Sequence, residues 1–480
     1  MKKYYVIFAL FLIIILGLLI RCAPLVLKSY GEPDAYYHIR MAELVKEEKT
    51  IPSFDEFSMQ GRAYSYAPIY HLFYACFSLL SFLPVSFLVR IFPQIFGIIG
   101  ILVVFIFSKK IFGSNKIALF SAFMLAAMTY HLFRTSAEPR PDGLALLIVP
   151  FIIFLLYSKH YKSAVFLSIF QVLLHPLSTL FLLLFLIVWS VCFKVRRKEI
   201  ETKLFLALIL VVVAVFAIWL LHLPYPVSNY VSNVSLESGE MQKPLMLEFF
   251  SLFSICWPFL LFGLIKMKNR FFLLLFFVFS FFYSMFGVRL GFFVSFPAAM
   301  IAGFGFAFII EKIRPYEKIF FMMFLVLCII ALYPFAQFGG ALLSEGEKSS
   351  MVWLSENTEK DANIMSLWDR GHPLTYYAKR KVVMDGYFEF APDLSKRNEA
   401  MKELIATADC NKIYTQIHKF NINYFYVFSG AMDSLDFGNG IMESYNCEIE
   451  RGVFENDKSK IIGYDLESMP KEAKRKITNT

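Results

Sequence analysis

The chain opens with MKK and then stays apolar from Tyr4 to Ile20, reading YYVIFALFLIIILGLLI. A run of 17 apolar residues is long enough for a helix to cross the hydrocarbon core of a bilayer. Similar runs recur as far as residue 338, and 58% of the 480 residues are hydrophobic. The runs are continuous rather than alternating, which argues against a transmembrane β-barrel. The sequence therefore predicts a polytopic α-helical membrane protein.

The first apolar segment fits either a secretory signal peptide or a membrane span. A signal peptide ends at a cleavage site of small residues, whereas Arg21-Cys22-Ala23-Pro24 follows this segment. Arg21 directly before Cys22 also argues against a lipoprotein site. We expect an uncleaved first span.

The orientation of the chain depends on the apolar segment 66–83. If this segment does not cross, five basic loops share the side of Lys2 and Lys3, as the positive-inside rule requires. If it crossed, those loops would face outward. We expect a helix at the outer interface, bounded by Pro68 and Pro84. The predicted spans, about eleven, lie near residues 4–21, 86–108, 117–133, 142–158, 162–175, 177–193, 204–222, 248–265, 271–287, 289–310 and 318–338.

This topology divides the chain into two predicted domains. Residues 1–338 form a transmembrane domain with external loops 22–85 and 223–247, and residues 339–480 form an extracytoplasmic domain. The net charge of +9 comes mainly from Lys and Arg in short loops between spans, where they set orientation, so it does not indicate nucleic-acid binding.

The C-terminal segment mixes two kinds of periodicity. Asn398 to Ala408 is typical of an amphipathic helix, and Asn423 to Phe428 of a buried strand. We expect a small α/β domain. Cys410 and Cys447 lie in it and would be able to form a disulfide if the domain is outside the cytoplasm. No spacing of Cys and His indicates zinc.

The first external motif is Gly31-Glu32-Pro33-Asp34-Ala35-Tyr36-Tyr37-His38-Ile39-Arg40. An amphipathic helix is expected to follow, with Asp34 near its N-terminus. One interpretation of Asp34 is a helix cap. The other is a metal-binding carboxylate, supported by the aromatic, His and Arg groups beside it.

The second motif runs from Arg134 to Leu144 and contains two acids, Glu138 and Asp142. Asp142 also begins a predicted helix, so capping is again one interpretation. Glu138 and Asp142 would otherwise offer hard oxygen ligands to a divalent cation. Arg134 and Arg140 face the side that the positive-inside rule leaves poor in cations, and they fit an anionic ligand better.

Three further external features complete the set. Glu240 stands four residues before Pro244 in a polar loop. Arg289 lies at the outer end of a span, where it either snorkels to the interface or clamps a phosphate. The tetrapeptide Trp368-Asp369-Arg370-Gly371 is expected to form a turn with an exposed Trp that offers a binding surface.

Taken in order on one predicted face, these motifs resemble the catalytic subunits of oligosaccharyltransferase. These enzymes belong to the C-type glycosyltransferases, whose donors are polyprenyl-linked sugars. The resemblance runs from the first span to about residue 386, and includes Val383-Met384-Asp385-Gly386. It implies transfer of a glycan from a polyprenyl (dolichyl) pyrophosphate or phosphate to a protein, with inversion, at Asn in Asn-x-Ser/Thr on the outer membrane face.

The resemblance also implies roles for particular residues. Asp34, Asp142 and Glu138 would ligate Mn²⁺ or Mg²⁺, and Glu240 would orient the acceptor, making Asp34 and Glu240 the catalytic pair. Arg289 would bind the lipid pyrophosphate. The acceptor-binding residues would be Trp368 and Asp369. The implied protein is a single-subunit, archaeal-like enzyme of the plasma membrane, embedded in the bilayer, with a lipid-linked donor and a protein or peptide acceptor as partners.

The sequence departs from the family pattern at several positions. Leu144 stands where the family has a second acid, Leu367 replaces a Trp, and Arg370 replaces a Tyr. Two other functions stay open. One is a monosaccharide transferase that uses a polyprenyl monophosphate donor and acts on Ser/Thr, a lipid or a glycan. The other is a transporter of lipid-linked sugars, which the outer position of the carboxylates disfavours because transporters place such groups near the midplane.

Overall fold

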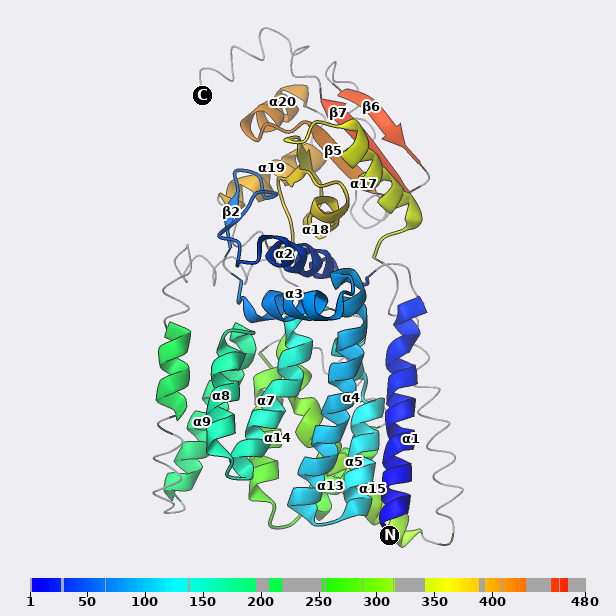
Figure 1. Ribbon diagram of the computed structural model, residues 1–480, viewed down its shortest axis with the longest axis vertical. Helices are drawn as coiled ribbons and strands as arrows, with labels where there is room; N and C mark the ends of the chain where they lie inside the picture. Colours follow the sequence, from blue (N-terminus) through cyan, green and yellow to red (C-terminus); the bar gives the residue numbers. More distant parts are fainter. Residues whose placement is uncertain are drawn as a thin grey trace. The chain divides into compact units, whose positions relative to one another are not determined.

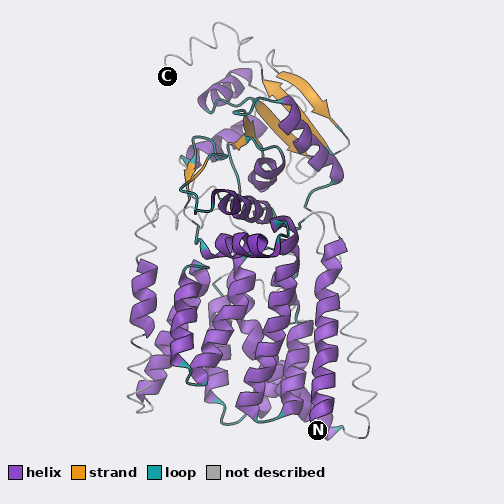
Figure 2. Ribbon diagram, viewed as in Figure 1, coloured by secondary structure: helices purple, strands orange, loops and turns teal. Residues whose placement is uncertain are grey.

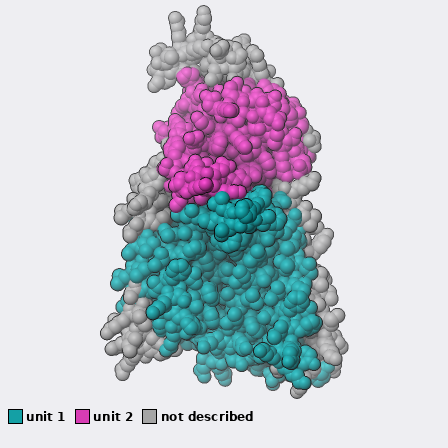
Figure 3. All heavy atoms as spheres, viewed as in Figure 1, with its two compact units in different colours: residues 1–28, 67–223, 231–340 teal, residues 29–66, 224–230, 341–480 magenta. Residues whose placement is uncertain are grey.

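The computed structural model describes residues 2–26, 30–64, 66–136, 139–195, 208–217, 256–286, 288–313, 342–387, 393–406, 409–428, 450–456 and 458–464, with the single positions 206, 253 and 315. The chain divides into two compact units, which Figure 3 colours teal and magenta. Unit 1 comprises residues 1–28, 67–223 and 231–340, and unit 2 comprises residues 29–66, 224–230 and 341–480.

Unit 1 is built of apolar helices. Figure 1 shows most of them running alongside one another, whereas α3 lies crosswise to them. Helix α15 packs against α5 and α13, and α4 packs against α5 and α7. The helices are α1 (Lys3–Cys22), α3 (Ile69–Ser81), α4 (Val85–Phe112), α5 (Asn115–Ala127), α6 (Thr129–Arg134), α7 (Pro141–Tyr157), α8 (Tyr161–Val172), α9 (Pro176–Val195), α13 (Trp257–Lys266), α14 (Phe271–Ser284) and α15 (Ser295–Lys312), with the short 3-10 helices η1 (Ala23–Val26) and η4 (Val288–Val294).

Ten of the predicted spans overlap these helices or the apolar helix Leu208–Ala217, and the eleventh, 318–338, lies outside the described residues. Within the described part of the chain, three helical segments are long and apolar enough to cross a membrane: Lys3–Cys22, Val85–Phe112 and Gly291–Lys312. Shorter apolar segments of 10 to 17 residues, among them Ile69–Ser81 and Pro176–Cys192, complete the set in the described residues. The expected helical class is thus confirmed, and the segment 66–83 contains a 13-residue helix, α3.

The predicted span 117–133 is two helices rather than one. The chain becomes extended at Met128, with ψ 117°, between α5 and α6. The buried Arg21 explains how this break is tolerated, because its guanidinium donates to the carbonyl of Ala126 at 3.5 Å and lies 2.7 Å from His131 Nδ1. A further N–H of Arg21 donates to Thr135 Oγ1 at 3.0 Å. Backbone and side-chain acceptors near the break are therefore satisfied inside the bundle.

Unit 2 contains every strand that the structure describes (Figure 2). A five-stranded sheet has the order β4-β3-β5-β7-β6. Strand β3 pairs in parallel with β4 and β5, and β7 pairs antiparallel with β5 and β6. The strands are β3 (Asn363–Met365), β4 (Lys381–Val382), β5 (Tyr424–Phe428), β6 (Glu450–Glu455) and β7 (Ser459–Tyr464), and a separate hairpin pairs β1 (Phe54–Asp55) with β2 (Arg62–Ala63).

Five helices accompany these strands: α2 (Asp34–Glu48), α17 (Glu345–Asn357), α18 (Trp368–Tyr377), α19 (Leu394–Ala406) and α20 (Cys410–Lys419). The predicted helix from Asn398 overlaps α19, and the predicted buried strand is β5, so both predictions are confirmed. Cys410 is disulfide-bonded, while its expected partner Cys447 lies outside the described residues. Helix α18 connects the parallel strands β3 and β4 and packs against α2, which brings segments from both ends of the sequence together.

Candidate active site

Asp34 is the first residue of α2 and thus lies at the N-terminus of the helix, as predicted. The N-cap position belongs to Pro33, and no side-chain cap hydrogen bond is present. The same holds for α7, where Arg140 takes the N-cap position and Asp142 follows Pro141 in the first turn. Neither acid therefore stands at the N-cap position itself, and the two interpretations of their carboxylates stay predictions. A carboxylate in the first turn still interacts favourably with the helix dipole.

Unit 2 places Asp34 beside Gly386, a position 352 residues later in the printed sequence. A methyl group built on Gly386 would lie 3.1 Å from Asp34 Oδ1 and 2.9 Å from His372 Nε2. These two polar atoms are therefore at most about 6 Å apart, on either side of a space that only glycine leaves open.

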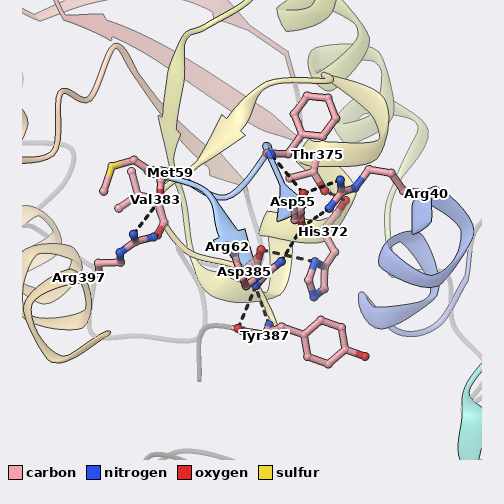
Figure 4. Close-up of polar contacts among 11 residues, drawn as sticks. Arg40, Asp55, Met59, Arg62, His372, Thr375, Val383, Asp385, Tyr387 and Arg397 are labelled. Carbon is pink, nitrogen blue, oxygen red and sulfur yellow. Dashed lines mark hydrogen bonds and ion pairs between the residues drawn. The ribbon is translucent and has the colours of Figure 1, made fainter. Parts of the chain in front are cut away.

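A buried network of charges holds the segment that carries Gly386 (Figure 4). Arg40 from α2 makes a bidentate pair with Asp55, at 2.8 and 2.7 Å. Arg62 donates to Asp55 at 2.9 Å and to Asp385 at 2.8 Å. It also donates to the carbonyl of Tyr387 at 2.9 Å. The guanidinium of Arg62 therefore ties the β1–β2 hairpin to the residues on both sides of Gly386.

The electrostatics of this network follow from burial and pairing. Burial opposes ionisation of Asp55, but Arg40 and Arg62 outweigh it and hold its pKa below the usual range. The pKa of Asp385 is likewise lowered, since Arg62 overcomes the effect of burial. Burial lowers the pKa of His372 to about 4. At neutral pH the site therefore contains ionised carboxylates and a neutral imidazole.

Aromatic rings cover one side of these charges. Tyr37 of α2 packs edge to face on Tyr387, with ring centroids 4.5 Å apart, and lies 5.1 Å from the ring of His372. The Tyr387 hydroxyl lies 3.2 Å from His38 Nε2, and Tyr66 packs against both rings. The rings exclude water from the ion pairs, which strengthens their attraction.

The Asp55 carboxyl gives a pH prediction. Because its native pKa is lower than the value of about 3.9 expected in an unfolded chain, its contribution to stability is present above that value and lost as pH falls toward the native pKa. Thermal unfolding measured from roughly pH 5 down to roughly pH 2 is expected to show a steep loss of stability for the wild type. An Asp55→Asn variant is expected to be less stable at pH 6 and to show a shallower slope. Parallel curves for the two proteins would contradict this assignment.

The Trp368-Asp369-Arg370-Gly371 segment is the first turn of helix α18 rather than a separate turn. Trp368 is 39% exposed, as expected for a binding surface. Arg370 explains why a helix replaces the expected turn. Its guanidinium donates to Asp369 Oδ2 at 2.7 Å and to Glu347 of α17 at 2.9 Å. Its guanidinium also lies 3.7 Å from the ring centroid of Phe428. Arg370 thus fastens the start of α18 to α17 and β5, while burial raises the pKa of Asp369.

Gly371 lets α18 approach the segment before Gly386. A methyl group at Gly371 would lie 2.2 Å from the carbonyl oxygen of Met384 and 2.5 Å from Asp385 Cα. Both are backbone atoms, so the strand end would have to move. Gly371→Ala is expected to lower the free energy of unfolding by about 1–3 kcal/mol, measured by urea denaturation of the purified chain. Glu356→Ala, on the exposed end of α17, is the control, and an equal effect of the two changes would contradict the packing argument.

Unit 1 contains the second predicted motif. Asp142 is buried, and its Oδ2 lies 3.6 Å from Arg134 Nη1. The guanidinium of Arg134 also lies 4.2 Å from the ring centroid of Phe292. Arg140 is buried too, and Arg289 lies in η4. Glu138 and Glu240 lie outside the described residues, so their predicted roles stay predictions.

The structure thus brings together some predicted residues within each unit. Asp34 shares unit 2 with Trp368 and Asp369, whereas Asp142 and Arg289 belong to unit 1. Among the residues that the structure describes, no three side chains of His, Cys, Asp or Glu are grouped to hold a metal. The donors that are present, carboxylate oxygens and an imidazole nitrogen, are nevertheless the ligand types of Mn²⁺ and related ions.

Sequence reasoning missed Asp55, Arg62 and His372. Asp55 and Arg62 lie in a polar loop without a recognisable motif, and Asp385, the second acid that Arg62 meets, is 323 residues away from it. His372 directly follows the tetrapeptide Trp368–Gly371, and Asp385-Gly386 belongs to the segment that carries the family resemblance. The position of His372 next to this tetrapeptide is therefore the signal in the sequence that points to His372 as a site residue.

No family model matches the chain. One curated relative, the dolichyl-phosphooligosaccharide-protein glycotransferase 2 of Archaeoglobus fulgidus, is 32% identical over 130 residues. This match spans 24% of the chain and 21% of the relative, so it covers about a fifth of that protein's length. The expected resemblance to an archaeal oligosaccharyltransferase, which is a glycosyltransferase, is confirmed.

Solved structures extend the likeness of fold over nearly the whole chain. The Archaeoglobus fulgidus oligosaccharyltransferase tethered to an acceptor peptide with an NVT sequon matches with a TM-score of 0.71 and 12% identity, covering 98% of this chain and 75% of that one. The ArnT protein of Cupriavidus metallidurans bound to undecaprenyl phosphate matches with a TM-score of 0.57 and 11% identity, covering 96% and 98%. The chain therefore has the fold of multi-pass membrane glycosyltransferases.

Proposed function

We propose that this chain transfers a glycan from a polyprenyl (dolichyl) pyrophosphate or phosphate to a protein, at Asn in Asn-x-Ser/Thr, with inversion at the sugar. The observation that carries the proposal is the position of Asp34 against Gly386 and His372 in unit 2, in a chain with the fold of an oligosaccharyltransferase. A structure of the Archaeoglobus fulgidus protein also contains an inhibitory peptide and a dolichol-phosphate, which supports a lipid-linked donor and a peptide acceptor.

A divalent cation belongs to the proposal. Asp34 fits such an ion because its carboxylate borders the space beside Gly386 that a methyl group would fill. Asp142 and Glu138 are its proposed partners from the second motif. The ion, Mn²⁺ or Mg²⁺, would neutralise the charge that develops on the leaving phosphate. A complex of the Archaeoglobus fulgidus protein with Zn and sulfate supports a metal requirement.

The remaining roles follow the electrostatic needs of the reaction. Arg289 would hold the lipid phosphate, where a guanidinium fork matches the oxygens. Glu240 would act with Asp34 in binding and polarising the acceptor amide. Trp368 and Asp369 would bind the acceptor residue beyond the modified Asn, and the exposed ring of Trp368 supports a contact surface there. Preorganised groups of this kind stabilise the transition state without reorganisation.

The proposal includes where the reaction takes place. The enzyme would act as a single subunit of the plasma membrane, with residues 339–480 on the extracytoplasmic side. The disulfide at Cys410 supports an oxidising environment for this part.

A second function is favoured by one observation. The match to ArnT covers 98% of that chain, and that structure contains undecaprenyl phosphate, a monophosphate lipid. The second candidate is therefore a monosaccharide transferase with a polyprenyl monophosphate donor, acting on Ser/Thr, a lipid or a glycan.

The test supplies the purified chain with one of two radiolabelled donors, a dolichyl-pyrophosphate oligosaccharide or a dolichyl-phosphate monosaccharide, and an Asn-x-Thr peptide. The proposal expects a labelled glycopeptide from the pyrophosphate donor, and no product when the Asn is replaced by Gln. Labelled peptide only from the monophosphate donor would support the second candidate with a Ser/Thr acceptor, and no transfer from the pyrophosphate donor in the presence of Mn²⁺ would overturn the first proposal.

A further inference from the structure

His372 is a buried histidine that the proposed mechanism leaves without a role. It lies in α18 with no exposed surface. In the part of the chain that the structure describes, neither of its ring nitrogens makes a hydrogen bond. A buried imidazole without such partners costs free energy, so an explanation is needed for its presence beside Asp34.

The carboxylate of Asp385 faces one nitrogen of this ring. Asp385 Oδ2 lies 3.9 Å from His372 Nδ1. Two groups fix the orientation of the carboxylate, because Oδ1 accepts from Arg62 at 2.8 Å and from the Tyr387 N–H at 2.9 Å. A carboxylate on this side favours the tautomer that carries its proton on Nδ1. The lone pair of the neutral ring is then on Nε2.

The lone pair on Nε2 borders the same space as Asp34. The methyl position of Gly386 is 2.9 Å from Nε2 and 3.1 Å from Asp34 Oδ1. Metal–ligand bonds are about 2.0–2.6 Å long, shorter than these two distances, so a single ion beside Gly386 bridges the nitrogen and the oxygen after the two side chains close toward it by roughly 1 Å or less. A carboxylate behind a histidine that faces a metal is a recurrent arrangement in metal sites, where it orients the ring and raises its basicity.

We propose that His372 Nε2 and the Asp34 carboxylate ligate one divalent transition-metal ion, and that Asp385 orients His372 for this purpose. The inference deepens the metal requirement of the proposed function. It assigns a nitrogen ligand from the segment after Trp368 and Asp369, and an orienting carboxylate held by Arg62. The network of Arg62 thereby maintains the metal site in addition to the fold of unit 2.

A nitrogen ligand also makes the metal selective. Imidazole nitrogen is a ligand of first-row transition-metal ions, strongly of Zn²⁺ and more weakly of Mn²⁺, whereas Mg²⁺ and Ca²⁺ favour oxygen ligands. The pair of His372 and Asp34 is therefore expected to prefer Mn²⁺ over Mg²⁺, and to lose this preference when the imidazole is removed.

The test measures Mn²⁺ binding to the purified full chain by electron paramagnetic resonance, without donor or acceptor. Wild type is expected to bind Mn²⁺ with electron spin-echo modulation from one imidazole nitrogen. His372→Ala is expected to abolish the modulation and to weaken Mn²⁺ affinity at least about tenfold, and Asp385→Asn to weaken it about 10- to 100-fold while the ring remains. His418→Ala, which removes an exposed histidine of α20, is the matched control and is expected to change neither quantity.

A second variant guards against misfolding. Gly386→Ala keeps every ligand but fills the space between Asp34 and His372, and is expected to weaken Mn²⁺ binding while circular dichroism shows that the secondary structure is retained. Mn²⁺ binding without nitrogen modulation, or unchanged affinity in His372→Ala, would overturn the proposal. Because no substrate is present, these outcomes are separate from glycan transfer: a chain that binds Mn²⁺ through His372 and transfers no glycan would overturn only the proposed function.

Discussion

Replacing Arg62 with Met is expected to lower the free energy of unfolding of unit 2 by about 3–5 kcal/mol. Arg62 is 3% exposed and pairs with Asp55 and Asp385, which are 2% and 3% exposed. Removing the guanidinium leaves two buried carboxylates with less compensating charge, and the Tyr387 carbonyl loses its donor. The measurement is proteolysis of the full chain over a range of urea concentrations, which reports the population of the opened state.

Two comparisons make this result specific. Lys396→Ala breaks an ion pair with Asp393 in which both side chains are more than half exposed, and it is expected to change stability by less than about 1 kcal/mol. Adding Asp385→Asn to Arg62→Met is expected to restore part of the loss, because one uncompensated charge disappears. Equal effects of Arg62→Met and Lys396→Ala would show that the buried network contributes no more than a surface pair.

Replacing Asp34 with Asn is expected to lower the rate of glycan transfer on the order of 100-fold or more, with unfolding close to wild type. The substitution keeps the size of the side chain but removes the charge beside Gly386. The measurement is glycopeptide formation from the pyrophosphate donor at saturating Mn²⁺. Glu48→Gln removes a carboxylate from the exposed far end of the same helix and is expected to leave the rate unchanged. Transfer that survives Asp34→Asn would remove Asp34 from the catalytic groups.

The sequence predicted those helices and strands whose formation depends on the residues of a single segment. The apolar run from Tyr4 predicted α1, the motif at Asp34 predicted the start of α2, and the short apolar run from Tyr424 predicted β5. In each case the hydrophobic periodicity or the helix-starting residues act within one element. The candidate site was also predictable in part, because the resemblance pointed to Asp34 and to the segment around Trp368.

The rest depends on pairings between distant segments. Nothing in the loop around Arg62 indicates that this side chain will meet Asp385, since that partner follows 323 residues later. The helical start at Trp368 was missed for a related reason: Asp and Gly favour a turn locally, and only the contacts of Arg370 with Glu347 and Phe428 show why the helix begins there.

The composition of unit 2 from residues 29–66 and 341–480 has a consequence for synthesis of the protein. Arg62 leaves the ribosome 323 residues before Asp385, which at about 5–20 residues per second is an interval of roughly 15–65 s. During this time the helix-forming segment at Asp34 and the hairpin at Asp55 lack the strands and helices that bury them. Unit 2 is therefore completed only after the segments between its two main parts have been synthesised. Chaperones and proteases that act on nascent chains have their longest access to the part of the site that is made first.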